Sequence, residues 1–382
     1  MSAPRRLHAL TGVRFLFALG VVLHHQGASN GLVHALGLSS APRWIANPVH
    51  AGYTGVSFFF VLSGFVLAWT YRDLAPSGVR AYAVARAARV LPLHALGLLL
   101  AAPFLVRRHV AIEGVEPAAW VRLAGESAVW ATLTQAWIPP LALTGNHPAW
   151  SLSAEAFFYA TLPLWIGGVR RASSARLVAS ALGLAALALA WTWAAHRAGL
   201  AGISGLVATG ADAARGDVAN ALRFLPPLRL PEFVIGGIAG ELVARGAVGA
   251  RARAWSLPVG GGLLALAVVG LADHLPYLPV HSGGLALPCA LMVVGLTADG
   301  PVQRALGSAP AQRLGEASYA VYLLHVPLWW IVGAVDERAL GLAGARPGLV
   351  LVLYLGGLTA VSLAAFRWVE EPARRWVRRR WG

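Results

Sequence analysis

Long apolar segments with few charges recur along the whole chain of 382 residues. The first is LTGVRFLFALGVVLHHQG, and the others lie at about 52–71, 90–106, 153–169, 176–195, 229–244, 256–272, 284–298, 316–335 and 348–366. Hydrophobic residues make up 57% of the chain and charged residues 12%, a balance that a soluble domain of this length does not show. Because about 20 apolar residues cross a bilayer as a helix, the sequence predicts an all-α bundle of about ten transmembrane spans.

The arginines indicate how such a bundle is oriented. All 31 basic residues other than histidine are arginines, and about two thirds of them lie near the termini and in the loops at 72–89, 170–176, 245–253 and 299–315. Cytoplasmic loops carry an excess of basic residues. This bias predicts that both termini are cytoplasmic. A full crossing by the weaker apolar segment at 127–143 would reverse the bias, so we expect an outer or re-entrant segment there.

The net charge of +15 could indicate a nucleic-acid-binding protein. The arginines flank apolar segments, however, and form no stripe along a soluble helix, so they favour lipid headgroups and not nucleic acid. Arg14 interrupts the first apolar run and no clear cleavage site follows, which predicts an uncleaved first span. The absence of lysine is typical of a GC-rich bacterial genome. We expect one domain at 1–372 in a bacterial plasma membrane, and a basic cytoplasmic tail at 373–382.

Cysteine and histidine usage excludes several kinds of site. Cys289 is the single cysteine, so the chain can form no intrachain disulfide and no thiolate metal cluster, and a buried inert thiol is expected. The 12 histidines are scattered and lack metal-ligand spacing with carboxylates. The sequence therefore predicts no metal site and no permanently bound cofactor.

Arg14 and His25 place two ionisable side chains inside the first apolar segment. Eleven positions at about 100° per residue bring both groups to one helix face, about 16 Å apart. Ionisable groups in a membrane span are costly and are usually functional. We therefore predict a site on this face. His24 adjoins His25, and a register error of one residue would transfer the assignment to it.

Two further segments place polar side chains near a membrane surface. Arg86 and Arg89, one helical turn apart in RAARVLP, form a fork suited to phosphate, although positive-inside anchoring explains them equally well. In HPAWSLSAEAFFY, Ser151 and Glu155 lie one turn apart, and Trp150 suits the interface. A carboxylate at that depth needs a cation or a proton of its own. We favour a functional role over a structural ion pair.

The span near the C-terminus contains a stripe of polar residues. Ser318, Tyr322 and His325 fall on one helix face, which predicts an interhelical hydrogen-bond network that either packs helices or contacts substrate. Glu370 and Glu371 precede Pro372, so we expect the last helix to end there with an acidic pair that needs no catalytic explanation.

Taken in order, these motifs resemble the acyltransferase 3 family of bacterial membrane acyltransferases. The resemblance is carried by the Arg-x10-His spacing, FFFVLSGFVLAW, RAARVLP, HPAWSLSAEAFFY, SYAVYLLHVP and the closing EEP. It implies transfer of an acyl group, often acetyl, from acyl-coenzyme A to a hydroxyl of a glycan, lipid or natural product. Because a short basic tail follows Pro372, we expect no fused hydrolase-like domain.

The resemblance also implies roles for individual residues. Arg14 and His25 fall in its catalytic centre, and the arginine pair at 86 and 89 is its RxxR motif. Its WSL-type motif matches Trp150, Ser151 and Glu155. The chemistry is consistent, because imidazole can serve as the base that deprotonates an acceptor and arginine can stabilise the developing oxyanion.

On this hypothesis the two arginines hold the nucleotide phosphates of acyl-CoA, and Glu155 orients a catalytic group or fixes an arginine. Direct transfer and an acyl-histidine intermediate stay open. So do two kinds of acceptor: a surface polysaccharide or lipid-linked sugar, and a small natural product such as a macrolide. The alternative class is a polytopic transporter that moves an anionic substrate past its intramembrane Arg, His and Glu residues. Against it, the sequence has no paired halves with similarly broken helices.

Overall fold

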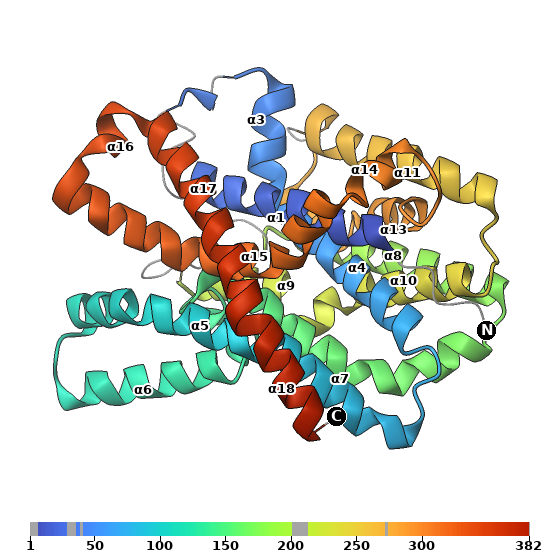
Figure 1. Cartoon of the computed structure of the whole chain (residues 1–382), viewed down its shortest axis with the longest axis horizontal. Helices are drawn as coiled ribbons and strands as arrows, with labels where there is room; N and C mark the ends of the chain where they lie inside the picture. Colours follow the sequence, from blue (N-terminus) through green and yellow to red (C-terminus); the bar gives the residue numbers. More distant parts are fainter. Residues whose placement is uncertain (1–6, 29–35, 39–40, 201–212, 272–273, 382) are drawn as a thin grey trace. The chain divides into compact units, whose positions relative to one another are not determined.

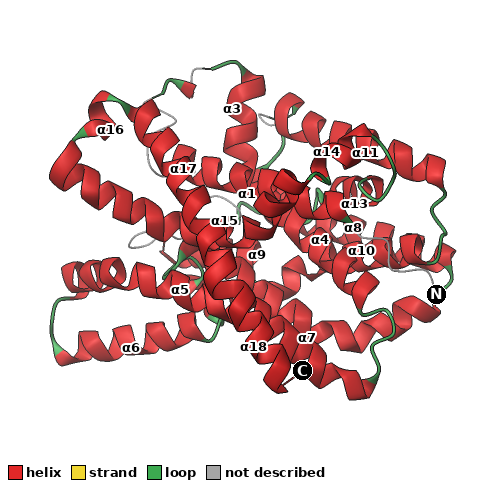
Figure 2. Cartoon of the chain, viewed as in Figure 1, coloured by secondary structure: helices red, strands yellow, loops and turns green. Residues whose placement is uncertain are grey.

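A computed structural model describes residues 7–28, 36–38, 41–200, 213–271 and 274–381. Within these ranges every regular element is a helix, and no strand occurs (Figure 2). The predicted all-α class is therefore confirmed for the described part of the chain.

The apolar segments predicted to cross the membrane each overlap a helix (Figure 1). These helices are α1 (His8–Ala28), α4 (Gly55–Thr70), α5 (Val79–Glu113), α7 (Trp150–Arg171), α8 (Ser174–Arg197), α10 (Pro226–Ala244), α11 (Ala250–Ala265), α13 (Ala286–Gly295), α15 (Ala309–Val335) and α17 (Pro347–Ala365). Shorter helices lie between and after them: α3 (Arg43–His50), α6 (Pro117–Ala131), α9 (Ala213–Phe224), α12 (Tyr277–His281), α14 (Pro301–Leu306), α16 (Leu342–Ala345) and α18 (Glu371–Trp381).

Seven helical stretches of the described residues are long and apolar enough to cross a membrane. They are Arg43–Thr70, Pro76–Glu113, Ser174–Arg197, Ala250–Gly270, Tyr277–Gly295, Ala309–Leu340 and Pro347–Trp381. The predicted spans outside this set are α1, α7 and α10, helices of 21, 22 and 19 residues that carry ionisable side chains. The chain is thus a multi-pass membrane protein. The tenfold crossing and its orientation stay predictions, and Arg5 and Arg6, which support the orientation, lie outside the described residues.

The weaker apolar segment at 127–143 does not form one continuous helix. Helix α6 ends at Ala131, and two short 3-10 turns follow at Gln135–Trp137 and Pro139–Leu141. Leu133 has a φ of 57°, a left-handed backbone conformation that a right-handed helix cannot continue through. A straight crossing by this segment is therefore excluded, as the sequence indicated, whereas its side of the membrane stays a prediction.

The expectation that the last helix ends at Pro372 is wrong. Helix α17 passes into a π turn at Phe366–Glu370, and α18 continues to Trp381. Pro372 occupies the second position of α18, directly after the wide turn. Proline is tolerated in the first turn of a helical segment, where its missing N–H costs little. Most of the predicted tail at 373–382 is therefore helical.

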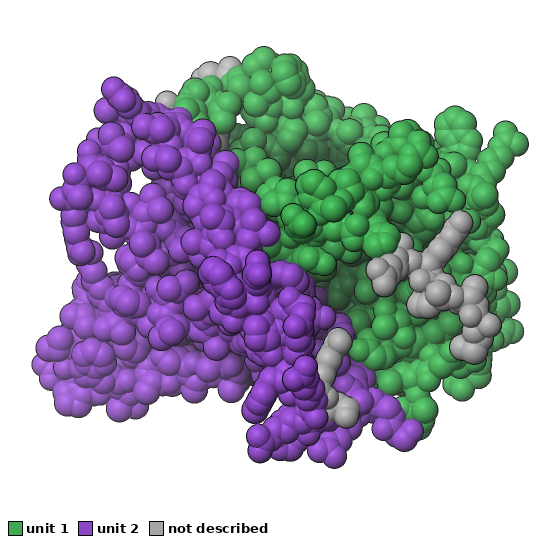
Figure 3. Space-filling view, viewed as in Figure 1, with its two compact units in different colours: residues 1–76, 161–199, 228–319 green, residues 77–160, 200–227, 320–382 purple. Residues whose placement is uncertain are grey.

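The chain divides into two compact units (Figure 3). Unit 1 contains the described residues within 1–76, 161–199 and 228–319, and unit 2 contains those within 77–160, 200–227 and 320–382. Helices α7 and α15 each contribute residues to both units.

Glycines let two helices of unit 1 touch through their backbones. A β-carbon at Gly64 of α4 would collide with the Phe233 carbonyl of α10, and one at Gly236 would collide with the Val61 carbonyl of α4. Membrane helices commonly use small residues in this way because packing, and not water exclusion, holds them together. This close crossing brings Ser57 and Phe60 of α4 next to the start of α10.

Helix α1 packs on the other side of α4 in unit 1. The Phe17 and Phe58 rings stack with centroids 3.7 Å apart and an angle of 7° between their planes. A β-carbon at Gly52 would strike the Gly20 carbonyl and lie 2.8 Å from the β-carbon of His24. The turn before α4 therefore lies directly against the histidine-bearing end of α1.

A buried carboxylate joins the ends of three helices in unit 1. Glu241 of α10 accepts two hydrogen bonds from Arg72, at 2.8 and 2.9 Å, and one from Arg245 at 3.0 Å. The hydrogen bonds to Glu241 raise the pKa of Arg72 above its ordinary value. Arg245 also donates to the last carbonyls of α7, including that of Val169 at 3.1 Å. Such cations satisfy carbonyl groups that a helix end leaves unpaired.

We predict that Gly236→Ala destabilises the protein. The added methyl group meets backbone atoms of Val61 that cannot rotate away, and such overpacking costs about 1–3 kcal/mol. Thermal unfolding of the detergent-purified protein measures the loss. Gly262→Ala in α11 is the matched control, because nothing lies within 4 Å of its added β-carbon. Equal melting temperatures for the two variants would contradict the backbone contact between α4 and α10.

Candidate active site

Helix α1 carries Arg14 and His25 on one face, as their spacing predicts. The helix runs without a break from His8 to Ala28, and both side chains are half-buried. Three helical turns, about 16 Å, separate the two residues along the helix axis. They belong to one face of unit 1 but do not form a direct contact pair.

The backbone of α1 fixes the protonation pattern of His25. Its Nδ1 lies 2.9 Å from the carbonyl oxygen of Val21. A carbonyl oxygen can accept but not donate, so Nδ1 carries the hydrogen. In the neutral ring Nε2 is then the nitrogen with the lone pair. The neutral ring therefore accepts a proton at Nε2.

His24 has different surroundings. Its ring meets that of His25 edge-on, with centroids 5.5 Å apart, and packs against the Tyr53 ring at 5.3 Å. Its Nδ1 is buried and has no hydrogen-bond partner among the described residues. The two adjacent histidines are therefore distinguishable: the tautomer of His25 is set by a backbone carbonyl, while His24 packs against an aromatic side chain.

A buried ionic cluster in unit 1 was not predicted. The Arg229 and Glu232 side chains of α10 are each 1% exposed and form a bidentate pair, with N–O distances of 2.7 and 3.1 Å. The Arg229 guanidinium also donates to the Ser57 hydroxyl and contacts Nδ1 of His281. The signal was present in the sequence, because RLPEF places arginine and glutamate one turn apart inside the predicted span at 229–244.

Aromatic rings connect this cluster to the histidines of α1. The His281 ring stacks on Tyr53 with centroids 5.6 Å apart, and Tyr53 packs against His24. Tyr277 contacts both Tyr53 and His281, at 4.8 and 5.1 Å. The exposure of these side chains falls from 41% at Tyr277 to 4% at His281. The apolar pattern of the sequence does not predict this group of rings, because its members lie in three segments that are far apart in the chain.

In unit 2, the RxxR motif has two different environments. Arg86 lies over the Tyr159 ring, with its guanidinium carbon 5.9 Å from the ring centroid. Arg89 forms an ion pair with Glu370, a carboxylate that is fully buried and also lies 3.4 Å from Arg374. Glu370 is therefore more than a helix cap, contrary to our expectation. The motif thus has one guanidinium over an aromatic ring and one paired with a carboxylate.

The WSL-type motif and the polar stripe meet in unit 2. The Ser151 hydroxyl lies 2.7 Å from the Tyr322 hydroxyl, and both are within 3.1 Å of the Pro148 carbonyl. Trp150 is buried against the Phe224 ring, with centroids 4.7 Å apart. The predicted hydrogen bonding between helices thus exists at Tyr322. These hydroxyls join the start of α7 to α15.

The remaining members of the stripe bond mainly within their own helix. Ser318 donates to the Gly315 carbonyl at 2.7 Å, and Nδ1 of His325 donates to the Tyr322 carbonyl at 2.6 Å. The His325 carbonyl in turn accepts from Tyr354 of α17 at 2.8 Å. Glu155 is half-buried on α7, one turn after Ser151. Among the three side chains of the stripe, Tyr322 is therefore the one that bonds to another helix.

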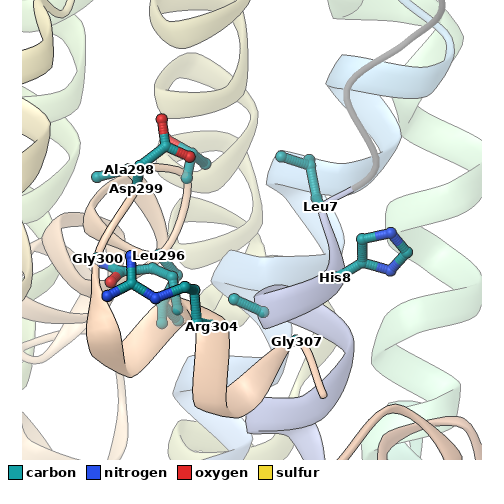
Figure 4. Close-up of a pocket in the computed structure, with 11 residues that line it drawn as sticks. Leu7, His8, Leu296, Ala298, Asp299, Gly300, Arg304 and Gly307 are labelled. Atoms are coloured by element: carbon teal, nitrogen blue, oxygen red, sulfur yellow. The ribbon is translucent and has the colours of Figure 1, made fainter. Parts of the chain in front are cut away.

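No predicted site residue lines the cavity drawn in Figure 4. This cavity of about 420 Å³ lies at the N-terminal end of α1 and is lined by His8, Asp299 and Arg304, among others. Within the described residues no three His, Cys, Asp or Glu side chains form a group that could hold a metal ion. Cys289 is buried, as expected.

The fold defines a class: a multi-pass helical membrane protein. Comparison with known proteins assigns the family. Residues 7–367 match the family described as an acyltransferase domain. The chain belongs to this family, the acyltransferase 3 family, and the resemblance noted in the sequence is confirmed.

Two relatives cover most of the chain. Acyltransferase MdmB of Streptomyces mycarofaciens is 34% identical over 345 residues, which is 84% of this chain and 78% of the relative. Exopolysaccharide production protein ExoZ of Rhizobium meliloti (strain 1021) is 30% identical over 340 residues, which is 85% of this chain and 90% of the relative. No solved structure matches the chain. The class of enzyme is therefore that of a membrane acyltransferase.

We predict that Glu370→Gln destabilises the protein, whereas Glu371→Gln has little effect. Removing the charge of Glu370 leaves Arg89 without its buried carboxylate, a loss that costs about 3–5 kcal/mol. Glu371 pairs with Arg375 at the surface, where such pairs contribute about 0–1 kcal/mol. Thermal unfolding of the two variants measures the difference, and equal losses would contradict a structural role for the Arg89–Glu370 pair.

Proposed function

We propose that this acyltransferase moves an acyl group, acetyl in the simplest case, from acyl-coenzyme A to a hydroxyl of its acceptor. The observation that carries the proposal is the hydrogen bond from Nδ1 of His25 to the Val21 carbonyl. This bond leaves Nε2 as the basic nitrogen of the neutral ring. Acyl transfer to an alcohol needs such a base, because the hydroxyl must lose its proton as its oxygen attacks.

In the proposed reaction, Nε2 of His25 takes the proton of the acceptor hydroxyl. The hydroxyl oxygen bonds to the thioester carbonyl carbon, the carbon–sulfur bond breaks, and the imidazolium returns the proton to the leaving thiolate. The products are the ester and coenzyme A. Arg14 or a neighbouring hydrogen-bond donor is assigned to the charge that develops on the carbonyl oxygen, since donors in an apolar environment stabilise an oxyanion strongly. Glu155 is assigned to orienting one of these groups.

Arg86 and Arg89 are proposed to bind the nucleotide phosphates of the donor. Arginine binds phosphate through paired N–H groups. Because Arg89 is already paired with Glu370, we expect Arg86 and Arg89 to contribute unequally to phosphate binding. Arg86 is expected to provide most of the phosphate affinity, and Arg89 to fix the end of α18 beside α5.

The acceptor is proposed to be a hydroxyl-bearing glycan or lipid-linked sugar, with a small natural product as the second candidate. The name of the relative ExoZ refers to exopolysaccharide production, which favours a glycan. A bacterial plasma membrane is the expected location, since it brings cytoplasmic acyl-CoA and surface glycans to one bilayer. Trp150, Ser151, Ser318, Tyr322 and His325 are expected to support the site through packing.

A direct assay tests the reaction class. Purified protein is incubated with labelled acetyl-coenzyme A and a panel of oligosaccharide and natural-product acceptors, and coenzyme A release is followed with a thiol-reactive dye. Release that depends on the acceptor, together with a labelled ester in the products, is expected. Vectorial uptake of label into proteoliposomes without a covalent product would contradict the proposal and favour a transporter.

His25→Ala is expected to reduce transfer by about 10²–10⁴-fold, the usual contribution of a general base. His196→Ala is the control, because it removes an exposed histidine ring at the end of α8. Initial rates of ester formation measure both variants. Full activity of the His25 variant would exclude this residue as the base.

Arg86→Gln is expected to weaken coenzyme A binding by about ten- to a hundredfold, because a hydrogen bond to a charged group contributes about 1.5–3 kcal/mol. The double variant Arg89→Gln/Glu370→Gln removes the buried pair as a neutral unit and should affect binding less. Arg80→Ala, an exposed arginine on the same helix, is the control. Calorimetric titration with coenzyme A measures affinity, and an unchanged dissociation constant in the Arg86 variant would refute the phosphate role.

A further inference from the structure

The buried cluster around Arg229 is too costly to be incidental. Arg229 and Glu232 are each 1% exposed on their side chains, and burying such a pair commonly gains no stability over apolar residues of the same size. The bidentate bond of Arg229 to Glu232 and the depth of its guanidinium argue against a role in binding an anionic substrate. Its contact with Nδ1 of His281 shows a group that this charge can position.

His281 is the group that Arg229 orients. Its Nδ1 lies 3.1 Å from a terminal nitrogen of Arg229 and 2.9 Å from the Ser282 hydroxyl. A guanidinium donates hydrogen bonds and never accepts them, so Nδ1 of His281 must be the acceptor. The proton of the neutral ring is then on Nε2. If Nδ1 carried the proton, its N–H would point at the N–H of the buried Arg229, and neither group could accept the hydrogen bond.

The position of His281 is fixed from three directions. Ser57 of α4 donates to its backbone carbonyl at 3.4 Å and accepts from Arg229 at 3.2 Å. The Arg229 guanidinium is itself held over the Phe60 ring, 5.2 Å from the centroid. Side chain and backbone of His281 are therefore both tied to the close crossing of α4 and α10.

The orientation of His281 is transmitted to the base. Its ring stacks on Tyr53 at 29°, Tyr53 packs edge-on against His24, and His24 packs edge-on against His25. Gly52, next to Tyr53, lies in backbone contact with α1 at Gly20. A displacement of the His281 ring would thus move Tyr53 and its turn, and with them the end of α1.

We propose that Arg229, Glu232 and His281 form a positioning centre that holds Tyr53 against the His24–His25 end of α1. The centre works by locking His281 in one tautomer and one orientation. It rests on the proposed function in that His25 is the base whose position it sets. The centre does not exchange protons with the substrate, which separates its role from that of His25.

The tautomer is tested without reference to activity. Full-length protein labelled with 15N-histidine is examined by NMR in nanodiscs at neutral pH, and the His281 signals are identified by their loss in His281→Asn or His281→Phe. A non-protonated Nδ1 and a protonated Nε2 are expected. A protonated Nδ1 would overturn the proposal.

The positioning role is tested with two variants that each keep half of the geometry. Asparagine at 281 retains an acceptor for Arg229 but loses the ring that stacks on Tyr53. Phenylalanine retains the ring but loses the acceptor. Both should lower kcat by about tenfold or more, with the KM for acyl-CoA unchanged, because misplacement of a catalytic group lowers the rate of the chemical step. His196→Asn, at the exposed end of α8, is the control.

A second measurement reads the position of the base directly. The rate at which diethyl pyrocarbonate modifies His24 and His25, followed by peptide mass spectrometry, should change in both His281 variants and stay at the wild-type value in His196→Asn. Wild-type kcat and wild-type modification rates in His281→Asn would overturn the role of the stacked ring. If the wild-type protein releases no coenzyme A with any acceptor, the proposed function fails, while the NMR and modification results still decide on the positioning centre.

Discussion

The cost of placing charge among apolar helices governs this structure. Each strongly buried carboxylate described above has a guanidinium within reach: Glu232 has Arg229, Glu241 has Arg72 and Arg245, and Glu370 has Arg89. Breaking such pairs costs far more than forming them gains, so they specify which helices lie together more than they add stability. In unit 1 the pairs involve α10, and in unit 2 they fix α18 to α5. The apolar packing fills the space between these contacts.

Two histidines of unit 1 have opposite tautomers for reasons that lie in their neighbours. A backbone carbonyl next to His25 can only accept, which puts the hydrogen on Nδ1. A guanidinium next to His281 can only donate, which puts the hydrogen on Nε2. The same side chain is thus prepared as a base in one place and as a donor in the other, without any difference in the residue itself.

Periodicity and composition predict the helices well, because burial in lipid demands continuous apolar runs that are legible in one dimension. Contacts between segments that are distant in the sequence are harder to predict. The polar stripe predicted that Tyr322 bonds to another helix, but it did not identify Ser151 as the partner. The pairing of Arg89 with Glu370 could not be anticipated, since it depends on how α18 continues past Pro372. The Arg229–Glu232 pair was visible in its span, whereas the aromatic contacts to His281 arise from tertiary packing alone.

The π turn at Phe366–Glu370 also sets the rotational phase of the chain that follows it. A π turn holds one residue more than an α turn, which rotates every later side chain by about 100°. Glu370, the last residue of the turn, is fully buried, whereas Glu371 is partly exposed. Loss of a single residue from the turn would restore an ordinary helix and carry the wrong side chain to Arg89. The length of this short stretch is therefore as constrained as its composition.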